Sequence, residues 1–373
     1  MATSYKTFLN NDKTTTRTLL HEAIPITGTL VSGTYLSAGS EVNIKSYGHG
    51  MFQSVYDYPY LSSSANHIFD ITAGYSGVTN EGTSYKSTLS SSTNSQNSKK
   101  INIYSQLCQQ LVGYNTASYI RPFDRDGDLA GGTKFKEIVA LSFSRLLIKD
   151  EIKKGSFTMH VHTGTLANAA AKSIIISDTN GDTSYKVNSP AGEYGLLYSG
   201  SVTTGASNNA IGLIYYQAGM VILTASVFNA HVGREGGPAP GSPTYATTNF
   251  FTGSAAHDDN HIRRALQIGT IDGVANGCRN RIKYISFNNT TELNSTIYFC
   301  RASHNEFNYS ANPTYITGSK IRVKSNSFDQ PNSYMTTVGM YSSDNELLAV
   351  AKLSEPLKKT PDNELTLRVR LDY

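Results

Sequence analysis

The sequence predicts a mainly β protein with a few short helices, made of β-sandwich-like domains with an extended N-terminal arm and long loops. Three observations predict this fold class. Apolar and polar residues alternate in several short segments, most strictly in residues 365–371. Turn-forming residues separate these segments. Tyr, which favours strands, occurs 24 times in the 373 residues.

An extended arm is predicted for residues 1–50. Short strand-like pieces lie around residues 28–31 and 41–44. Pro25 precedes both pieces and lacks the backbone N–H group that a helix would need as a hydrogen-bond donor. The arm is therefore expected to be extended rather than helical.

Residues 51–154 are predicted to form a mixed α/β region. Its aromatic-rich beginning, residues 52–60, fits an anchoring segment as well as the edge of an ordinary core. Residues 77–100 are rich in Ser and Thr, so we expect a long mobile loop or a segment that only a partner orders.

A helix should follow, because apolar residues recur at helical spacing and Gly113 suits a C-terminal cap. The apolar residues are Ile101, Tyr104, Leu107, Cys108 and Leu111. Residues 135–146 fit a helix or a strand.

A middle β domain is predicted for residues 155–275. Residues 157–162 alternate between apolar and polar side chains, as in a strand with one buried face. Residues 211–227 are mostly apolar and carry no charge, which is typical of strands buried on both faces. Asn180-Gly181 lies between two strand-like runs and predicts a two-residue hairpin turn. The Pro- and Gly-rich residues 233–244 are predicted to be a loop.

A C-terminal β domain is predicted for residues 276–373. We expect a short strand at residues 296–301 and a hairpin whose strands are residues 334–341 and 346–353. The final strand should bury its leucine face and expose the other face to water or to a polar partner.

The composition excludes some classes of protein. Only 16% of the residues are charged, against about 25% in an average soluble domain, and the net charge is +4. The basic residues are scattered in pairs, so direct nucleic-acid binding is not expected. No apolar stretch approaches the ~20 residues of a membrane span, and the first ten residues lack the apolar segment of a secretion signal. Cys108, Cys278 and Cys300 form no CxxC motif, which favours reduced, buried thiols.

Two clusters of side chains are weak candidates for a metal site. Asp124, Asp126 and Asp128 lie in a loop, and carboxylates grouped in a turn suit calcium. The Gly and Glu positions of an EF-hand are missing, so turn chemistry is the stronger interpretation. The segment 178–182 has the same form and the same interpretation.

A second metal candidate is a pair of histidines, His160 and His162. They lie two residues apart on a predicted strand, so both could face one ion. No third ligand stands at a convincing spacing. Residues 257–261 contain two further histidines but fit a polar loop equally well. No catalytic motif, cofactor-binding motif or activated nucleophile is visible, and we expect no enzyme activity and no cofactor.

Three segments resemble virion structural proteins of T4-like, contractile-tailed phages of marine bacteria and cyanobacteria. They are residues 52–67, 305–315 and 338–354. The resemblance spans most of the chain and is weakest across residues 77–100 and 233–244. It implies a baseplate or tail-periphery subunit, made in the host cytoplasm and located in the virion. It also implies other virion proteins as partners, with many copies in a symmetric assembly, and it brings no catalytic residues.

The residues themselves suggest how such a subunit would work. Open strand edges and an extended arm can pair with neighbouring chains and so bridge them. Low charge and many Tyr residues suit large, static interfaces, although they also fit an ordinary β protein. Three alternatives stay open at this point. They are a tail-fibre or carbohydrate-binding adhesin, a neck or capsid decoration protein, and a polysaccharide-degrading tail enzyme, which would need two carboxylates in a cleft.

Overall fold

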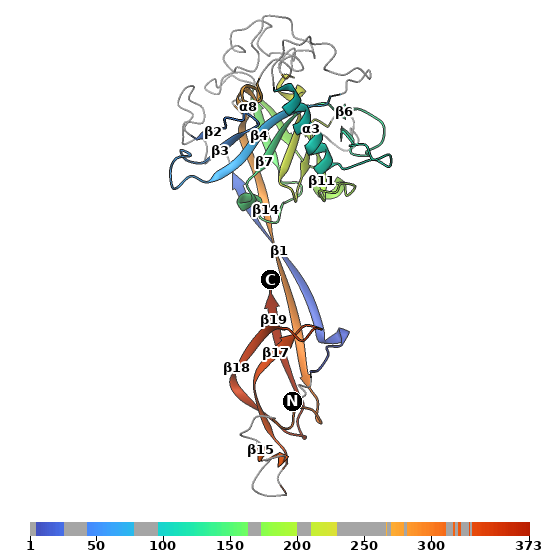
Figure 1. Cartoon of the computed structure of the whole chain (residues 1–373), viewed down its shortest axis with the longest axis vertical. Helices are drawn as coiled ribbons and strands as arrows, with labels where there is room; N and C mark the ends of the chain where they lie inside the picture. The colour runs from blue at the N-terminus through green and yellow to red at the C-terminus, as the bar shows by residue number, and fades with distance from the viewer. Residues whose placement is uncertain are drawn as a thin grey trace, which may run out of the picture. The chain divides into compact units, whose positions relative to one another are not determined.

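The structure is a computed structural model (Figure 1). The chain forms two compact units. It describes residues 5–25, 43–77, 96–162, 173–199, 210–229, 266, 270–279, 282–310, 316–317, 320–321, 328 and 330–373. Unit 1 consists of Met1–Leu19 and Glu292–Tyr373, and unit 2 of Leu20–Thr291. Both ends of the chain therefore belong to unit 1, and unit 2 is an insertion between them.

Unit 2 is built on one antiparallel sheet. Its strands follow the order β14-β9-β10-β11-β12-β13-β7-β4-β3-β2. Their bounds are β2 (Ile44–Ser46), β3 (Gln53–Tyr56), β4 (His67–Tyr75), β7 (Glu137–Phe143), β9 (Thr158–His162), β10 (Ser173–Ser177), β11 (Tyr194–Ser199), β12 (Gly212–Tyr215), β13 (Met220–Thr224) and β14 (Ile282–Ala302). The short strand β8 (Glu151–Ile152) pairs with β14, and β5 (Phe123–Asp124) pairs with β6 (Lys134–Phe135).

The central strands of this sheet are buried on both faces. Along β7, Val139 and Leu141 enter one apolar cluster, whereas Ile138 and Ala140 enter a second. The same alternation holds along β12 and β13. Since successive strand residues point to opposite faces, an uninterrupted apolar run is what two buried faces require. The interpretation of residues 211–227 as strands buried on both faces is confirmed for β12 and β13, whereas a short helix begins at Ser226.

The first apolar cluster lies inside the curled sheet. Phe143 on β7 packs against Phe287 of β14 at 5.1 Å between ring centroids, and against Phe157 beside β9 at 6.2 Å. Strands far apart in the sheet order thus face one another across this core. Helix α8 (Ile271–Arg279) adds Val274, Ala275 and Cys278 to the same cluster.

The second apolar cluster lies under helix α3 (Asn97–Leu111), which crosses the outer face of the sheet (Figure 1). The helix approaches β4 closely at Gly74, where a Cβ would lie 2.8 Å from the carbonyl oxygen of Lys100. Tyr104 on its buried side donates a hydrogen bond of 2.7 Å to the carbonyl oxygen of Phe135. The predicted helix is therefore confirmed, and it begins at Asn97 rather than after residue 100.

Unit 1 contains three small strand groups. Strand β1 (Lys13–Pro25) pairs with β14. Strand β14 also pairs with β19 (Leu365–Asp372), from Ser295 opposite Asp372 to Ala302 opposite Leu365. Strands β17 (Ser333–Tyr341) and β18 (Leu347–Lys359) form the predicted hairpin. Two further short strands, β15 (Ile316–Thr317) and β16 (Lys320–Ile321), pair with each other.

Short helical segments complete the described elements. They are η1 (Asn10–Asp12), α4 (Arg145–Ile148), α5 (Gly181–Ser184) and α6 (Ser226–Asn229). Residues 135–146, which fit a helix or a strand, are mostly strand β7 followed by the start of α4. The mainly β fold class with few short helices is confirmed.

Several expected boundaries differ from those of the structure. Residues 51–154 and 155–275 share one sheet and one core, because β4 and β7 pair with each other and β7 pairs with β13. The expected separate strand at residues 296–301 is part of the 21-residue β14. In the arm, β1 is a long strand, while residues 26–42 lie outside the described residues, as do residues 78–95 of the predicted loop.

The predicted hairpin turn at Asn180-Gly181 is wrong. The turn residues instead lead into α5, and the partner of β10 is β11, which begins only at Tyr194. A bonding network around Asp178, described below, fixes this connection and outweighs the local turn preference.

Replacing Phe143 tests the two-sided core. Phe143→Ala should lower the free energy of unfolding of unit 2 by about 3–5 kcal/mol, because a large aromatic side chain is removed from a packed interior. Leu146→Ala is the matched control, since Leu146 is 83% exposed and should change stability by less than about 0.5 kcal/mol. Chemical denaturation followed by circular dichroism measures both, and equal effects would contradict the described core.

Candidate functional site

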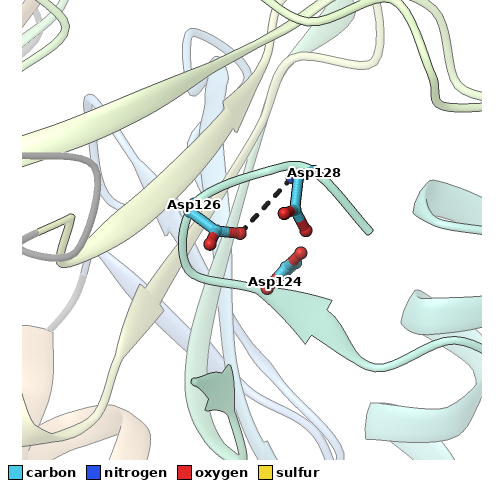
Figure 2. Close-up of side chains that lie close together, drawn as sticks. All are labelled: Asp124, Asp126 and Asp128. Carbon is cyan, nitrogen blue, oxygen red and sulfur yellow. Dashed lines mark hydrogen bonds between the residues drawn. The ribbon is translucent and has the colours of Figure 1, made fainter. Parts of the chain in front are cut away.

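The acidic loop holds three carboxylates close together. Asp124 ends β5, Asp126 and Asp128 follow in the loop, and one carboxylate oxygen from each lies within 4.8 Å of the others (Figure 2). Among the described residues, no other group of three potential metal ligands comes this close. The predicted grouping of these residues is therefore present in the structure.

The cation beside this cluster is a lysine. Lys134, opposite Asp124 on β6, places its Nζ 2.7 Å from Oδ1 of Asp124. The same ammonium group donates a hydrogen bond of 2.7 Å to the carbonyl oxygen of Ala130. The second carboxylate oxygen of Asp124 accepts a hydrogen bond of 2.7 Å from the backbone of Leu129. One oxygen of this buried carboxylate thus has an ion-pair partner, and the other has a hydrogen-bond donor.

The electrostatics of the loop follow from these contacts. Burial raises the pKa of Asp124, and Lys134 partly opposes that rise. In contrast, the pKa of the exposed Asp128 is lowered, chiefly because its carboxylate accepts a hydrogen bond from the backbone of Ala130. Lys134 and the loop amides satisfy the carboxylates, so the arrangement is that of a turn which supplies its own cation.

A similar clamp holds the second acidic segment. Asp178 is fully buried and accepts hydrogen bonds of 2.8 Å from the backbone of Gly155 and of Phe157. The hydroxyl of Tyr216 donates a third at 3.1 Å. At Gly181 a Cβ would lie 2.3 Å from that hydroxyl, so only glycine fits. Burial raises the pKa of Asp178. This segment joins a turn to a strand and presents no open ligand position.

The histidine pair does not form a visible metal site in the described part of the chain. His160 is half-buried and its ring lies 4.8 Å from that of Tyr284, with which it is paired across the strands. The side chain of His162 and the whole of residues 257–261 lie outside the described residues. The contact with Tyr284 gives His160 a packing role at the edge of the core.

Sequence reasoning missed a group of polar side chains on β3 and β4. Ser54 donates a 2.5 Å hydrogen bond to Oδ1 of Asp70, and Nε2 of His67 lies 2.8 Å from the same oxygen. A catalytic triad needs the histidine between the serine and the carboxylate. Here the carboxylate lies between the other two, so nothing activates Ser54. No sequence motif signals the group, because strand pairing brings it together.

A small groove lies next to Asp70. It has a volume of about 170 Å³, below the roughly 300 Å³ at which drug-sized ligand sites begin. Its lining is Met51, Phe52, Asp70, Thr72, Ile103, Ala140, Ser142 and Met220. This size and mostly apolar lining do not suit a substrate cleft with paired carboxylates.

Unit 1 has an exposed apolar surface that needs a functional explanation. The hairpin exposes Tyr341, Leu347, Leu348 and Val350 by 43–68%, and the ring of Tyr5 lies 4.8 Å from that of Tyr341. We call these five residues the hairpin patch. Four of them lie on β17 and β18, and Tyr5 contacts the hairpin through Tyr341. Exposed apolar side chains grouped on one hairpin are typical of a protein–protein contact.

Few apolar side chains of unit 1 are buried. Among its described residues these are Ala302, Met340 and Val369. Its buried polar and charged residues are Asp12, Ser295, Thr296, Ser333 and Lys359. Large apolar residues exposed elsewhere in the unit are Phe8, Leu9, Leu19, Leu293, Phe307, Tyr309, Phe328, Tyr334 and Tyr373. Most apolar side chains in the described part of unit 1 are therefore half-buried or exposed.

Polar contacts fasten the hairpin to the rest of unit 1. The fully buried Lys359 donates hydrogen bonds to the carbonyl oxygens of His304 and Thr360, and one of 2.7 Å to Oδ1 of Asn308. The hydroxyl of Ser333 donates to the carbonyl oxygen of Phe307. These bonds hold the base of the hairpin and leave the patch at its other end uncovered.

Removing the lysine of the acidic loop tests its role. Lys134→Met should lower the free energy of unfolding by about 3 kcal/mol, because the buried Asp124 loses its counter-charge. The control Lys149→Met breaks a pair with Glu22 in which both side chains are exposed, and should cost less than about 1 kcal/mol. A rise in the wild-type melting temperature on adding calcium would contradict the interpretation of the loop as self-sufficient.

The thiols offer a second test. Cys108 and Cys278 are buried, and burial raises the pKa of Cys108 to about 12. Cys300 is half-buried and its pKa is also raised. A thiol reagent whose absorbance changes on reaction should therefore label the native protein slowly, and at Cys300 first. After unfolding, it should label all three thiols. Rapid labelling of Cys108 in the native state would show that the α3 packing is incorrect.

Comparisons with known proteins do not identify the chain. No protein-family model, curated protein or solved structure matches it. No helix in the described parts is long and apolar enough to cross a membrane. The resemblance to phage virion proteins thus stays a prediction from the sequence segments, and function has to be argued from the residues and their geometry.

Proposed function

We propose that the protein is a structural subunit of a tailed-phage particle, located at the baseplate or tail periphery, which acts by joining neighbouring virion proteins. The observation that carries the proposal is the uncovered apolar surface of unit 1. The phage assignment itself rests on the resemblance of residues 52–67, 305–315 and 338–354 to virion proteins.

The division of burial between the units supports a joining role. Unit 2 has a large interior with apolar clusters on both faces of its sheet, so it can serve as a folded body. Unit 1 exposes side chains whose burial would each contribute roughly 1.5–3 kcal/mol. A neighbouring chain that covers them would supply the stabilisation that the unit does not supply itself.

The backbone of unit 1 supports the same role. Strands β17 and β18 pair only with each other among the described residues, so the outer edge of each strand is open. Open edges can accept a strand from a neighbour through backbone hydrogen bonds. Joining through exposed faces and open edges needs no chemical step, which agrees with a protein that is not an enzyme.

A carbohydrate-binding adhesin is the second candidate, favoured by an aromatic loop of unit 2. Tyr58 and Tyr60 are 55% and 37% exposed between β3 and β4. The loop is braced because both carboxylate oxygens of Asp57 accept hydrogen bonds from Asn66, at 2.6 and 2.8 Å. Exposed aromatic rings on a braced loop suit stacking on sugar rings. Binding of the purified protein to host cells, lost in Tyr58→Ala, would favour this function.

Particle incorporation tests the main proposal. Wild-type protein should be found in purified particles by immunogold labelling and located in the tail by cryo-electron microscopy. The double variant Leu347→Glu/Val350→Glu should be incorporated at least about tenfold less, because charges placed in an apolar contact cost more than 1.4 kcal/mol.

The matched control places the same charges on unit 2. Leu146→Glu/Val187→Glu changes two aliphatic residues that are 83% and 70% exposed, so it should be incorporated like the wild type. Absence of the wild-type protein from particles, or full incorporation of the hairpin-patch variant, would overturn the proposal.

A further inference from the structure

We infer that the side chains of Lys134 and Asp124 condense to an intramolecular amide bond, which cross-links β5 to β6 at the base of the acidic loop. The ion pair described above is the starting state of this reaction. The inference is independent of the proposed function, because it concerns a bond within unit 2 and not a partner.

Strand pairing places the two groups opposite each other. Asp124 on β5 lies directly across from Lys134 on β6, and Phe123 lies directly across from Phe135. Both phenylalanines are buried in the second apolar cluster. The side chain of Asp124 is 1% exposed and that of Lys134 is 17% exposed. The amine and the carboxyl group are therefore held in contact where little water reaches them.

The contact between the two groups is close but is not a hydrogen bond. Nζ of Lys134 lies 2.7 Å from Oδ1 of Asp124, yet this buried oxygen accepts no hydrogen bond from the described residues. The ammonium group donates to the carbonyl oxygen of Ala130 instead. A carboxyl C–O bond is about 1.2 Å long, so Nζ lies within about 4 Å of Cγ. Reacting atoms that are held roughly 3–3.5 Å apart are poised to form a bond.

Burial favours the uncharged forms that the reaction needs. A buried ion pair offsets its loss of hydration only when its hydrogen bonds are also made, and the one at Oδ1 of Asp124 is missing. Burial also raises the pKa of Asp124. Transfer of one proton from the ammonium group to this carboxylate gives a neutral amine, which is a nucleophile, and a neutral acid. Because both groups are fixed, their effective concentration can reach about 10⁵ M or more.

Asp128 is placed to transfer protons during the reaction. One of its carboxylate oxygens lies within 4.8 Å of one from Asp124, and Figure 2 shows the two groups turned toward each other. A hydrogen bond of 2.7 Å from the backbone of Ala130 holds Asp128 and is the main reason that its pKa is lowered. Asp128 is therefore an ionised base next to the reacting pair.

The reaction balances without an oxidant, a reductant or a cofactor. Nζ of Lys134 donates its electron pair to Cγ of Asp124, and a C–N bond forms. Asp128 accepts one proton from the nitrogen and delivers it to the hydroxyl oxygen of Asp124. The C–O bond then breaks and water leaves. One ammonium group and one carboxylate thus give one amide and one water molecule.

The mass of the full-length protein tests the inference. By electrospray mass spectrometry, the wild type should be lighter than its sequence mass by one water molecule. Lys134→Arg should have the full mass, because a guanidinium group keeps the counter-charge but is not deprotonated to a nucleophile. This variant also distinguishes the bond from a cyclic imide at Asp126-Gly127, which loses one water without Lys134. Equal circular dichroism of the two proteins would separate a missing bond from a loss of folding.

Peptide mapping locates the bond. Trypsin cuts the unfolded chain after Arg125, so residues 124 and 134 stay together only if they are joined, and tandem mass spectrometry should find the joined peptides. Two other lysines are internal controls that should stay unlinked. Lys149 forms an exposed pair with Glu22, and Lys359 donates its hydrogen bonds to carbonyl and amide oxygens only.

The rate of water loss tests the role of Asp128. In protein followed from cell-free synthesis, Asp128→Asn should lose the water at least about a hundredfold more slowly than the wild type. Equal rates would overturn the assignment of proton transfer to Asp128. A wild type of full mass, a Lys134→Arg protein that still lacks one water, or peptides joined through Lys149 as often as through Lys134 would overturn the cross-link itself.

Discussion

Burial of apolar side chains is the constraint on which the rest of this structure depends, and the two units meet it differently. In unit 2, β7, β12 and β13 are covered on both faces, by the curled sheet on one side and by α3 on the other. Because most residues of these strands are buried, a change of one methylene in a side chain alters the packing around it. In unit 1, β17 with 9 residues and β18 with 13 residues are longer strands, but the side chains of the hairpin patch are exposed.

Three buried charged groups in the described part of the chain are held by other protein groups. Their partners lie both near to them and far from them along the chain. Asp124 is held by Lys134 and Leu129, Asp178 by two backbone amides and a tyrosine, and Lys359 by three oxygens. A catalytic group needs a free acceptor or donor directed at a substrate. Groups that are satisfied in this way fix turns and hairpin bases instead.

Sequence patterns predicted local elements better than the relations between them. The helix after residue 100, the alternating last strand and the 342–345 hairpin follow from spacing alone and are present. The turn at Asn180-Gly181 was wrong because Asp178 binds residues 155 and 157, which are distant in sequence. The units were not foreseen, since unit 1 joins the two ends of the chain. The acidic cluster was predicted, but its partner Lys134 is identified only by strand pairing.

The topology gives a reason for placing contacts on the unit built from both chain ends. Two strands, β1 and β14, run through the boundary between the units, because Leu19–Leu20 and Thr291–Glu292 both lie within them. The chain therefore passes between the two units within strands and not within loops. Under the proposed function, these continuous strands let unit 1 hold the folded body of unit 2 beside a neighbouring protein.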